Sequence, residues 1–430
     1  MADRATAQTL DAARSRPKLD AAAVTAFSSD RAETAAAATW RTRAVSVLEG
    51  IEFPDRVRHL WRYTDPERLL PGKLLAPTAV QPAADALPDT PAIALVPGQA
   101  PRLNEAARSC GILVDTLFAS DEDAEFIGRA VAPDHGYFEA LNAAAYDCGL
   151  RIRVPRGLCL EAPLRVVVNA VPGADLLPRL LVIADAGSSV TVVEDHIGGD
   201  AGSVVVGVTE IFLAANAELR HVLVQRWQDG VRGHLTQRAV IDRDARFLGA
   251  TAGLGGAIVK VDLGGVLAGP GARSELVGVT LPEKRQHLDH HTVHQHLSGR
   301  TWSNIDFKAA VTDRARSAYT GLIRIEKHAG QSEAFQENRN LLLSERARAD
   351  TIPELEILTD DVSCSHGATA APVDPEQIFY LQSRGITAAE SLRLVVRGFV
   401  EPTLQQMPEG LRAEIEPLIQ ARLERIEGAA

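Results

Sequence analysis

Two short segments of this chain carry residue types that could bind a metal or a metal cluster. In the first, Asp360 to Thr369, the thiol of Cys364 lies two residues before the imidazole of His366, with two acids just upstream. Residues two apart in an extended chain point to the same side, and thiolate and imidazole are ligands that iron, copper and zinc accept. Two ligands are too few for a closed site. The segment therefore predicts half of a site completed by another chain, with a local turn network as the alternative.

The second segment, residues 287–296, contains five of the twelve histidines. On a β-strand, His290, His294 and His296 would share one face, where imidazoles could bind a transition metal. The alternative is structural: histidines on a solvent-facing strand, or stacked between neighbouring turns of a solenoid. We keep these three residues as candidate metal ligands beside that structural interpretation.

Composition limits the classes of partner. The 430 residues include 45 Lys and Arg against 56 Asp and Glu, a net charge of −11. Such a chain repels phosphate backbones and anionic lipid, so neither nucleic acid nor a membrane is an expected partner. No apolar run approaches the ~18–20 residues that a membrane span needs. There is no Gly-x-x-x-x-Gly-Lys-Ser/Thr phosphate loop, so any associated ATPase activity is expected from a partner.

The four cysteines predict a reducing compartment. They are widely spaced, without a Cys-x-x-Cys pair, at Cys110, Cys148, Cys159 and Cys364. That spacing argues against a disulfide framework and a zinc ribbon. The N-terminal residues show no apolar segment typical of a signal peptide. We therefore expect a cytoplasmic protein.

Three regions are expected to position these residues. Residues 1–148 show helical spacing of apolar residues and a Pro-rich connector over about 71–101, which predicts a mainly helical region. Residues 149–371 contain short alternating apolar runs bounded by turn residues, which indicate β-strands. Residues 372–430 return to helical spacing, and Asp374-Pro375-Glu376 is typical of a helix start. Helices are expected at about 388–399 and 411–426, with Pro417 breaking the latter or lying near a join.

The β region repeats at an approximate interval. A small-residue turn recurs with spacings of 31, 28, 27, 43 and 32, marked by Ala186, Ala217, Ala245, Ala272, Ala315 and Ala347. Spacing near 30 residues with a small residue at each corner favours stacked turns of a parallel β-helix. A jelly roll or β-sandwich is the alternative. The expected fold is mainly β, a parallel β-helix core flanked by helical regions at both ends.

Several segments resemble the SufB/SufD family of iron–sulfur cluster assembly scaffolds. The strongest lie towards the C-terminus, and their order and spacing match the family signature: Pro353–Ile357, Asp360–Thr369 and Phe379–Ile386. Supporting matches are Trp61–Asp65, Leu141–Ala144 and Asn338–Leu343. The SufD branch fits better, because Asn338 stands where SufB-like chains carry a cluster-assembly cysteine. This chain also has His366-Gly367 where they have His-Glu.

The resemblance implies a non-catalytic subunit with a right-handed β-helix core. It would pair through that core with a SufB-like paralogue and hold a SufC-like ATPase through its C-terminal helices, and a homodimer is possible for the isolated chain. His366 matches a family histidine at the paired interface, where a transient iron–sulfur cluster is thought to form, and Cys364 matches a family cysteine of less certain role. Whether a flavin binds, and through which residues, stays open.

Two alternatives remain at this point. One is a SufB-type homodimeric scaffold, against which Asn338 argues. The other is a polysaccharide-acting β-helix enzyme, which would need aromatic platforms and paired carboxylates; only 5% of the residues are aromatic. Two structural expectations follow from the leading interpretation. The solenoid should end in an unpaired strand edge near 338–357, and residues from about 376 to 426 should carry the ATPase docking surface, because their helices have little else to pack on.

Overall fold

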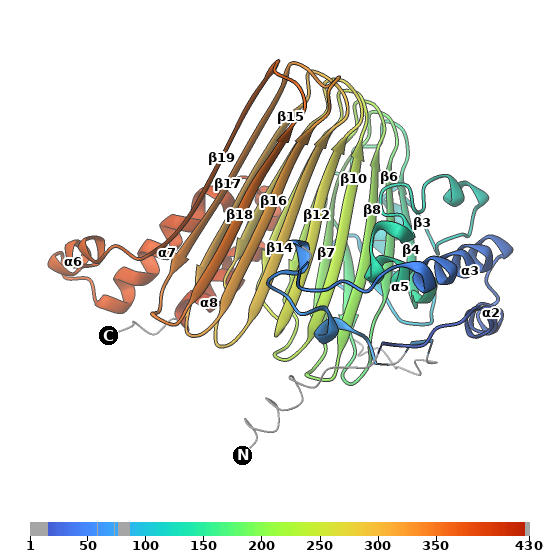
Figure 1. Ribbon diagram of the computed structural model, residues 1–430, viewed down its shortest axis with the longest axis horizontal. Helices are drawn as coiled ribbons and strands as arrows, with labels where there is room; N and C mark the ends of the chain where they lie inside the picture. The colour runs from blue at the N-terminus through green and yellow to red at the C-terminus, as the bar shows by residue number, and fades with distance from the viewer. Residues whose placement is uncertain (1–15, 58, 73, 76–86, 426–430) are drawn as a thin grey trace.

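The computed structural model describes residues 16–57, 59–72, 74–75 and 87–425 and shows a parallel β-solenoid (Figure 1). The chain alternates between two long sheets, so that strands β4 to β19 make about eight turns. Sheet A, with ten strands, contains in spatial order β19, β17, β15, β13, β11, β9, β7, β5, β1 and β2. Sheet B, with nine, contains β18, β16, β14, β12, β10, β8, β6, β4 and β3. The expected β-helix core with helical regions at both ends is confirmed.

The strand bounds follow the predicted β region closely. Sheet A is formed by β1 (Ala92–Leu95), β2 (Arg102–Leu103), β5 (Leu164–Ala170), β7 (Ser189–Gly198), β9 (Glu218–Gln225), β11 (Arg246–Gly253), β13 (Arg273–Thr280), β15 (Trp302–Val311), β17 (Ser332–Leu342) and β19 (Val362–Pro372). Sheet B is formed by β3 (Leu113–Asp115), β4 (Cys148–Val154), β6 (Pro178–Ala184), β8 (Val204–Leu213), β10 (Arg232–Ile241), β12 (Ile258–Leu267), β14 (His287–His296), β16 (Arg316–Ile325) and β18 (Arg348–Ile357).

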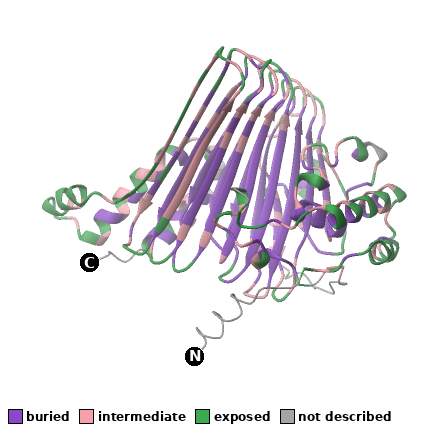
Figure 2. Cartoon of the chain, in the orientation of Figure 1, coloured by how far each residue is buried: buried purple, intermediate pink, exposed green. Residues whose placement is uncertain are grey.

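The core lies between the two sheets. Alternate residues of each strand point inwards, and because the strands pair in parallel register, like positions stack from turn to turn. One inward row runs through Leu219, Phe247 and Ser274 along sheet A. The middle strands are buried on both faces, whereas β18 is mostly of intermediate exposure and β19 is mostly exposed (Figure 2). The solenoid therefore ends in an uncovered turn.

The predicted alanine corners are real, but they belong to two different series. Ala217, Ala245 and Ala272 lie in turns that lead from sheet B to sheet A, whereas Ala315 and Ala347 lie in turns that lead from sheet A to sheet B. The change of series explains the irregular spacing of 43 in the sequence. These five alanines are buried, because a corner that faces its stacked neighbours has no room for a larger side chain. The sixth marker, Ala186, lies in the turn from β6 to β7 but is only half-buried.

The N-terminal region covers the outer face of sheet B. Its helices are α2 (Ala21–Asp30), α3 (Ala35–Gly50), α4 (Glu105–Ser109) and α5 (Tyr137–Ala145), with short 3₁₀ turns at His59–Trp61, Pro66–Leu69, Asp121–Glu125 and Pro133–His135. Val45 and Leu141 pack with Val206 of β8 in one apolar cluster. The region is less purely helical than predicted, because β1 pairs in parallel with β5 and extends sheet A. Residues 76–86 of the predicted connector lie outside the described residues.

The C-terminal helices are α6 (Pro375–Ser383), α7 (Ala388–Leu404) and α8 (Glu409–Glu424). Asp374 caps α6 as predicted, since its Oδ1 accepts the Glu376 N–H at 2.9 Å. Pro417 lies inside α8 without breaking it, so that expectation was wrong. Apolar residues of α7 and α8, among them Val396 and Ile419, pack on the outer face of sheet A. Ile426, the end of the predicted third helix, lies outside the described residues.

The division into residues 1–148, 149–371 and 372–430 stays a proposal. The solenoid proper begins with β4 at Cys148 and ends with β19 at Pro372. No helix within the described ranges is long and apolar enough to cross a membrane.

Candidate functional site

The open end of the solenoid is formed by β18 and β19. β18 pairs with β16 and β19 pairs with β17, and within the described ranges no strand pairs with the far edge of either. The edge expected near 338–357 is therefore only partly correct. β17, which contains Asn338, is covered by β19, and the exposed edges belong to 348–357 and 362–372. Pro353 lies in β18, as suits an edge strand, because proline cannot donate a ladder hydrogen bond.

Cys364 and His366 lie on β19 and share one side of the strand, as predicted. Cys364 is opposite Ala334 and His366 is opposite Gln336 of β17. The Cys364 side chain is half-buried against the interior apolar cluster, and this burial raises the pKa of its thiol. His366 is exposed, and its imidazole makes no hydrogen bond with another residue of the described ranges. The thiol is thus anchored in the core while the imidazole is available to a partner.

The neighbouring turn contributes buried amides that the sequence did not single out. Gln336 is buried beside His366, and neither atom of its amide bonds to another protein group of the described ranges. Asn338 is buried as well, and its Nδ2 donates to the Phe307 carbonyl at 3.0 Å. Asn340 donates to Asn338 Oδ1 at 2.6 Å. Only the pairing register, which follows from the repeat, could have placed Gln336 next to His366.

Asp360 and Asp361 do not join the pair. Both are exposed in the turn before β19, where the Asp361 carbonyl accepts the Gln331 N–H at 2.6 Å. Gly367, which stands at the position of the family glutamate, has open space where a side chain would start. The described part of the site is therefore one half-buried thiol, one exposed imidazole and one buried amide.

The histidines of β14 lie in a different environment. His290, His294 and His296 share one face as predicted, but that face is turned to the interior and not to solvent. His294 Nε2 lies 2.8 Å from Ser274 Oγ, and His296 Nε2 lies 2.8 Å from Ser303 Oγ. Burial lowers the pKa of His290 and of His296 to about 4.

No group of three or more His, Cys, Asp and Glu side chains within the described ranges is placed to hold a metal ion. The metal-ligand hypothesis for His290, His294 and His296 therefore finds no matching geometry. All three imidazoles have a lowered pKa and are neutral at pH 7, which makes their burial less costly. His294 and His296 also bond to serine hydroxyls, whereas His290 Nε2 has no partner within the described ranges. Of the two structural interpretations, the solvent-facing one was wrong, because the strand register points these histidines inwards, between the stacked strands β12 and β16.

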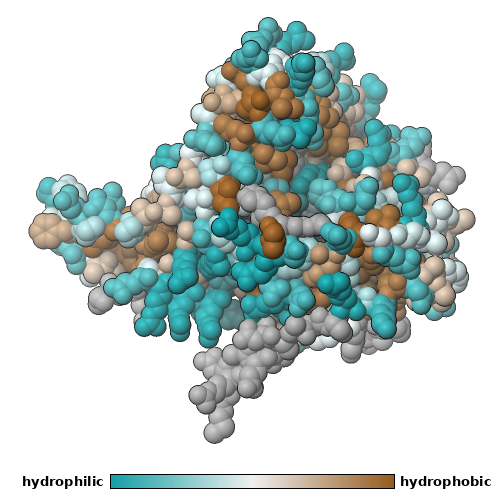
Figure 3. Space-filling view, viewed as in Figure 1, coloured by the Kyte–Doolittle hydropathy of each residue, from teal (hydrophilic) through white to brown (hydrophobic). Residues whose placement is uncertain are grey.

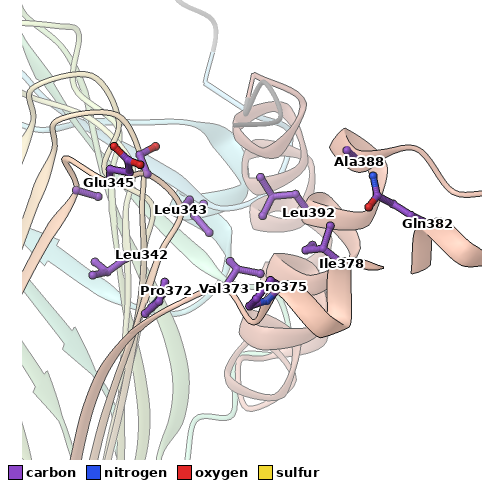
Figure 4. Close-up of a pocket in the computed structure, with 12 residues that line it drawn as sticks. Leu342, Leu343, Glu345, Pro372, Val373, Pro375, Ile378, Gln382, Ala388 and Leu392 are labelled. Atoms are coloured by element: carbon purple, nitrogen blue, oxygen red, sulfur yellow. The ribbon is translucent and has the colours of Figure 1, made fainter. Parts of the chain in front are cut away.

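A hollow at the C-terminal end of the solenoid offers a second candidate site (Figure 4). It measures about 640 Å³ and is lined mainly by apolar residues, with Leu342 and Leu343 on one side and Ile378 and Leu392 on the other. Beside it, α6 has no buried residue and carries Phe379 and Tyr380, which are 72% and 57% exposed. The helices α7 and α8 pack on sheet A, so the expectation that the helices of 376–426 have little else to pack on was wrong for them and holds for α6 alone.

The fold and this end of the molecule define a parallel β-solenoid protein whose last turn is open. The SUF system FeS cluster assembly, SufBD core domain, matches residues 167–399, more than half of the chain. The chain therefore belongs to the SufBD family of SUF-system iron–sulfur cluster assembly proteins. This membership leaves the polysaccharide-acting alternative without support.

Individual relatives agree with the family assignment. The iron–sulfur cluster assembly protein SufB of Bacillus subtilis is 29% identical over 316 residues, which cover 72% of this chain and 68% of the relative. A SufBD family protein of Mycobacterium leprae is 31% identical over 280 residues, 64% of this chain and 32% of that longer protein. One of Staphylococcus saprophyticus is 29% identical over 321 residues, 73% of this chain and 69% of the relative.

Proposed function

We propose that this chain is a SufD-like, non-catalytic subunit of a SUF scaffold. It pairs with a SufB-like paralogue through the open end of its solenoid, and a transient iron–sulfur cluster, the cargo of the complex, forms at that interface. The single observation that carries this proposal is the terminal turn, whose unpaired edges flank the exposed His366 and the half-buried Cys364.

The pairing follows from the physical chemistry of strand edges. A long unpaired edge presents backbone donors and acceptors that another strand can satisfy. Very short edge strands resist pairing with another chain, but β18 and β19 are ten and eleven residues long. Their length therefore does not prevent a partner strand from pairing with them. A partner strand on β19 would bring a second chain to His366, which supplies the missing ligands of a two-chain site.

The charge and softness of the ligands favour a labile cluster. An imidazole and a thiol can each bind iron, but burial keeps the Cys364 thiol protonated at neutral pH. The imidazole of His366, which is exposed to solvent, is therefore the better first ligand from this chain. With one strong ligand from each side, a nascent cluster could be passed on to another protein.

The ATPase docking surface is assigned to α6 and the adjacent hollow. α7 and α8 use their apolar faces on sheet A, whereas α6 exposes Phe379 and Tyr380. Exposed aromatic residues beside an apolar hollow are typical of a surface that receives a partner helix. The partner proposed here is a SufC-like ATPase.

A SufB-type homodimeric scaffold is the second candidate, favoured by the similarity to SufB of Bacillus subtilis. One experiment separates the two. The chain is expressed with and without its SufB-like paralogue and a SufC-like ATPase, and each purified complex is weighed by light scattering and assayed for iron and sulfide. The SufD-like role predicts cluster only when the paralogue is present, and a cluster-loaded homodimer would contradict it.

A further inference from the structure

A basic cavity lies where the N-terminal segment crosses the turns that lead into sheet B. It measures about 320 Å³ and is lined by five arginines against a single acid, Asp65: Arg56, Arg68, Arg285, Arg314 and Arg316. Two arginines come from the N-terminal segment, two from turns and one from β16. Figure 3 shows hydrophilic surface gathered over the lower turns of the solenoid on this face. The chain as a whole carries a net charge of −11, so this local cluster of positive charge is opposite in sign to the net charge of the chain.

The floor of the cavity is held by a fixed set of contacts. Thr64 Oγ1 donates to Asp289 Oδ2 at 2.5 Å and lies 2.8 Å from His287 Nε2. Since the hydroxyl has one proton, His287 donates to it from Nε2. The Lys260 ammonium, which lies 3.2 Å from Asp289, sits over the Trp61 ring. The segment Trp61–Asp65, singled out above only for its family resemblance, is thus anchored on sheet B.

The acids near the cavity are already engaged. Asp65 Oδ1 accepts the Glu67 N–H at 3.1 Å and caps the turn Pro66–Leu69. Asp350 accepts from Arg316 at 2.6 Å, and the Arg316 guanidinium lies 5.0 Å from the Tyr63 ring centroid. This arrangement fixes the direction of one guanidinium and covers the face of the aromatic ring that a base could otherwise stack on.

Two arginines of the cavity have no such engagement. Arg285 and Arg314 are exposed on adjacent turns, and neither guanidinium group forms a hydrogen bond or ion pair with another residue of the described ranges. Guanidinium groups present planar pairs of donors that match phosphate oxygens. Two such groups converging on one cavity form a clamp for an anion.

The lining of the cavity is mostly cationic, with five arginines against Asp65. Burial is the main cause that lowers the pKa of His287; the Asp289 carboxylate raises it, Arg316, Lys260 and Arg68 lower it, and the pKa is about 4. The His287 imidazole is therefore neutral at pH 7 and acts as a hydrogen-bonding group. An anion entering from solvent would find both positive charge and hydrogen-bond donors on the arginines.

We propose that this cavity binds a small phosphate-bearing anion, of the size of pyrophosphate or the phosphate end of a nucleotide. The volume lies at the low end of ligand pockets, which suits a phosphate group better than a whole dinucleotide. Arg285 and Arg314 clamp the outer oxygens, while Arg56, Arg68 and Arg316 supply the inner charge. The site lies on the face opposite the C-terminal helices and is independent of the cluster interface.

The test is calorimetric titration of the full chain with inorganic pyrophosphate and, separately, with ADP. Saturable binding is expected, weakening as salt is raised because the contacts are ionic. The double variant Arg285→Gln/Arg314→Gln should bind at least tenfold more weakly. Both side chains are exposed, so its melting temperature should be unchanged.

The matched control is Arg243→Gln/Arg300→Gln, which removes the same charge from turns at the other corner of the solenoid. It should keep the affinity of the unchanged chain. Equal weakening in both double variants would show diffuse surface attraction and overturn the proposal, as would failure of both probes to saturate at millimolar concentration. Pyrophosphate bound as tightly as ADP would identify phosphate itself as the recognised group, whereas tighter ADP would show added contacts to the nucleoside; either result supports the site.

Discussion

At the residue scale, neighbouring side chains of the terminal turn have different tasks. Cys364 packs against the interior, and its thiol has a raised pKa because of that burial. His366, two residues on, is exposed, and its imidazole bonds to no other described residue. A side chain that contributes little to folding, placed at an unpaired edge, is more readily explained by a role in an assembly.

The substitution His366→Ala should separate folding from cluster assembly. Because the imidazole is exposed, we expect a change in the free energy of unfolding within about 0.5 kcal/mol, while iron content of the co-purified complex falls at least fivefold. Melting temperature and iron are measured on the same preparation. His328→Ala, which removes an exposed histidine from the turn between β16 and β17 and not from β19, is the control and should leave both values unchanged. Normal iron loading in a stable His366→Ala complex would falsify the assignment.

At the element scale, the edge of β19 and the helix α6 are two surfaces open to partners in the described part of the chain. Sheet A is covered by α7 and α8, and sheet B by the N-terminal region. The open elements therefore lie together at one end of the solenoid, where two different partners could bind side by side (Figure 1).

Lysines on the β19 edge should block pairing. Ser365 and Thr369 are exposed on the outward side of the strand, and natural edge strands use lysine to prevent association. We expect Ser365→Lys/Thr369→Lys to fold normally but to weaken association with the SufB-like paralogue by at least tenfold, measured by light scattering or calorimetry. The control Thr42→Lys/Ser46→Lys adds the same charge to exposed positions of α3. Equal weakening by the control would mean that net charge, and not the edge, governs pairing.

Polar substitutions on α6 should release the ATPase. Phe379→Ser/Tyr380→Ser removes two exposed aromatic rings from a helix with no buried residue. The melting temperature should stay the same, while affinity for the SufC-like ATPase falls at least tenfold, because aromatic residues dominate such interfaces. Leu113→Ser removes an apolar side chain, 52% exposed, from β3 in the N-terminal part of the chain. This variant is the control and should bind the ATPase as the unchanged chain does. If the α6 variant also binds the ATPase with unchanged affinity, the docking surface does not lie on α6.

At the scale of the whole molecule, the solenoid lies between the N-terminal region, which packs on sheet B, and the helices α7 and α8, which pack on sheet A. Its repeat could be predicted from the sequence because small residues at corners and alternating apolar runs are local patterns. The inward direction of the β14 histidines could not, since a one-residue change of register would reverse it. Nor could the use of α7 and α8 on sheet A, because an apolar stripe on a helix does not say which surface it covers. His366 and Cys364 were found from their motif, whereas Gln336 became visible only through strand pairing.

The buried histidines make the solenoid sensitive to mild acid. Burial lowers the pKa of His290. The Asp289 carboxylate raises this pKa and the Lys260 ammonium lowers it, and the pKa in the folded chain is about 4. The unfolded chain binds a proton near pH 6.5. A depressed folded-state pKa means that stability is fully present above pH 6.5 and is lost as the pH falls towards 4, at up to about 1.4 kcal/mol per pH unit for each such histidine.

The substitution His290→Gln should therefore reduce the change in the free energy of unfolding with pH, in addition to any change in that free energy at pH 7. Between pH 7 and pH 5 the free energy of unfolding of the unchanged chain should fall more than that of the variant, by about 2 kcal/mol, the share of one histidine over this interval. Urea unfolding at the two pH values measures both differences. Comparing the two differences cancels any loss of packing that the substitution causes at pH 7. His328→Gln, at an exposed position, should keep the slope of the unchanged chain, and an identical slope in His290→Gln would show that this imidazole is protonated without cost in the folded solenoid.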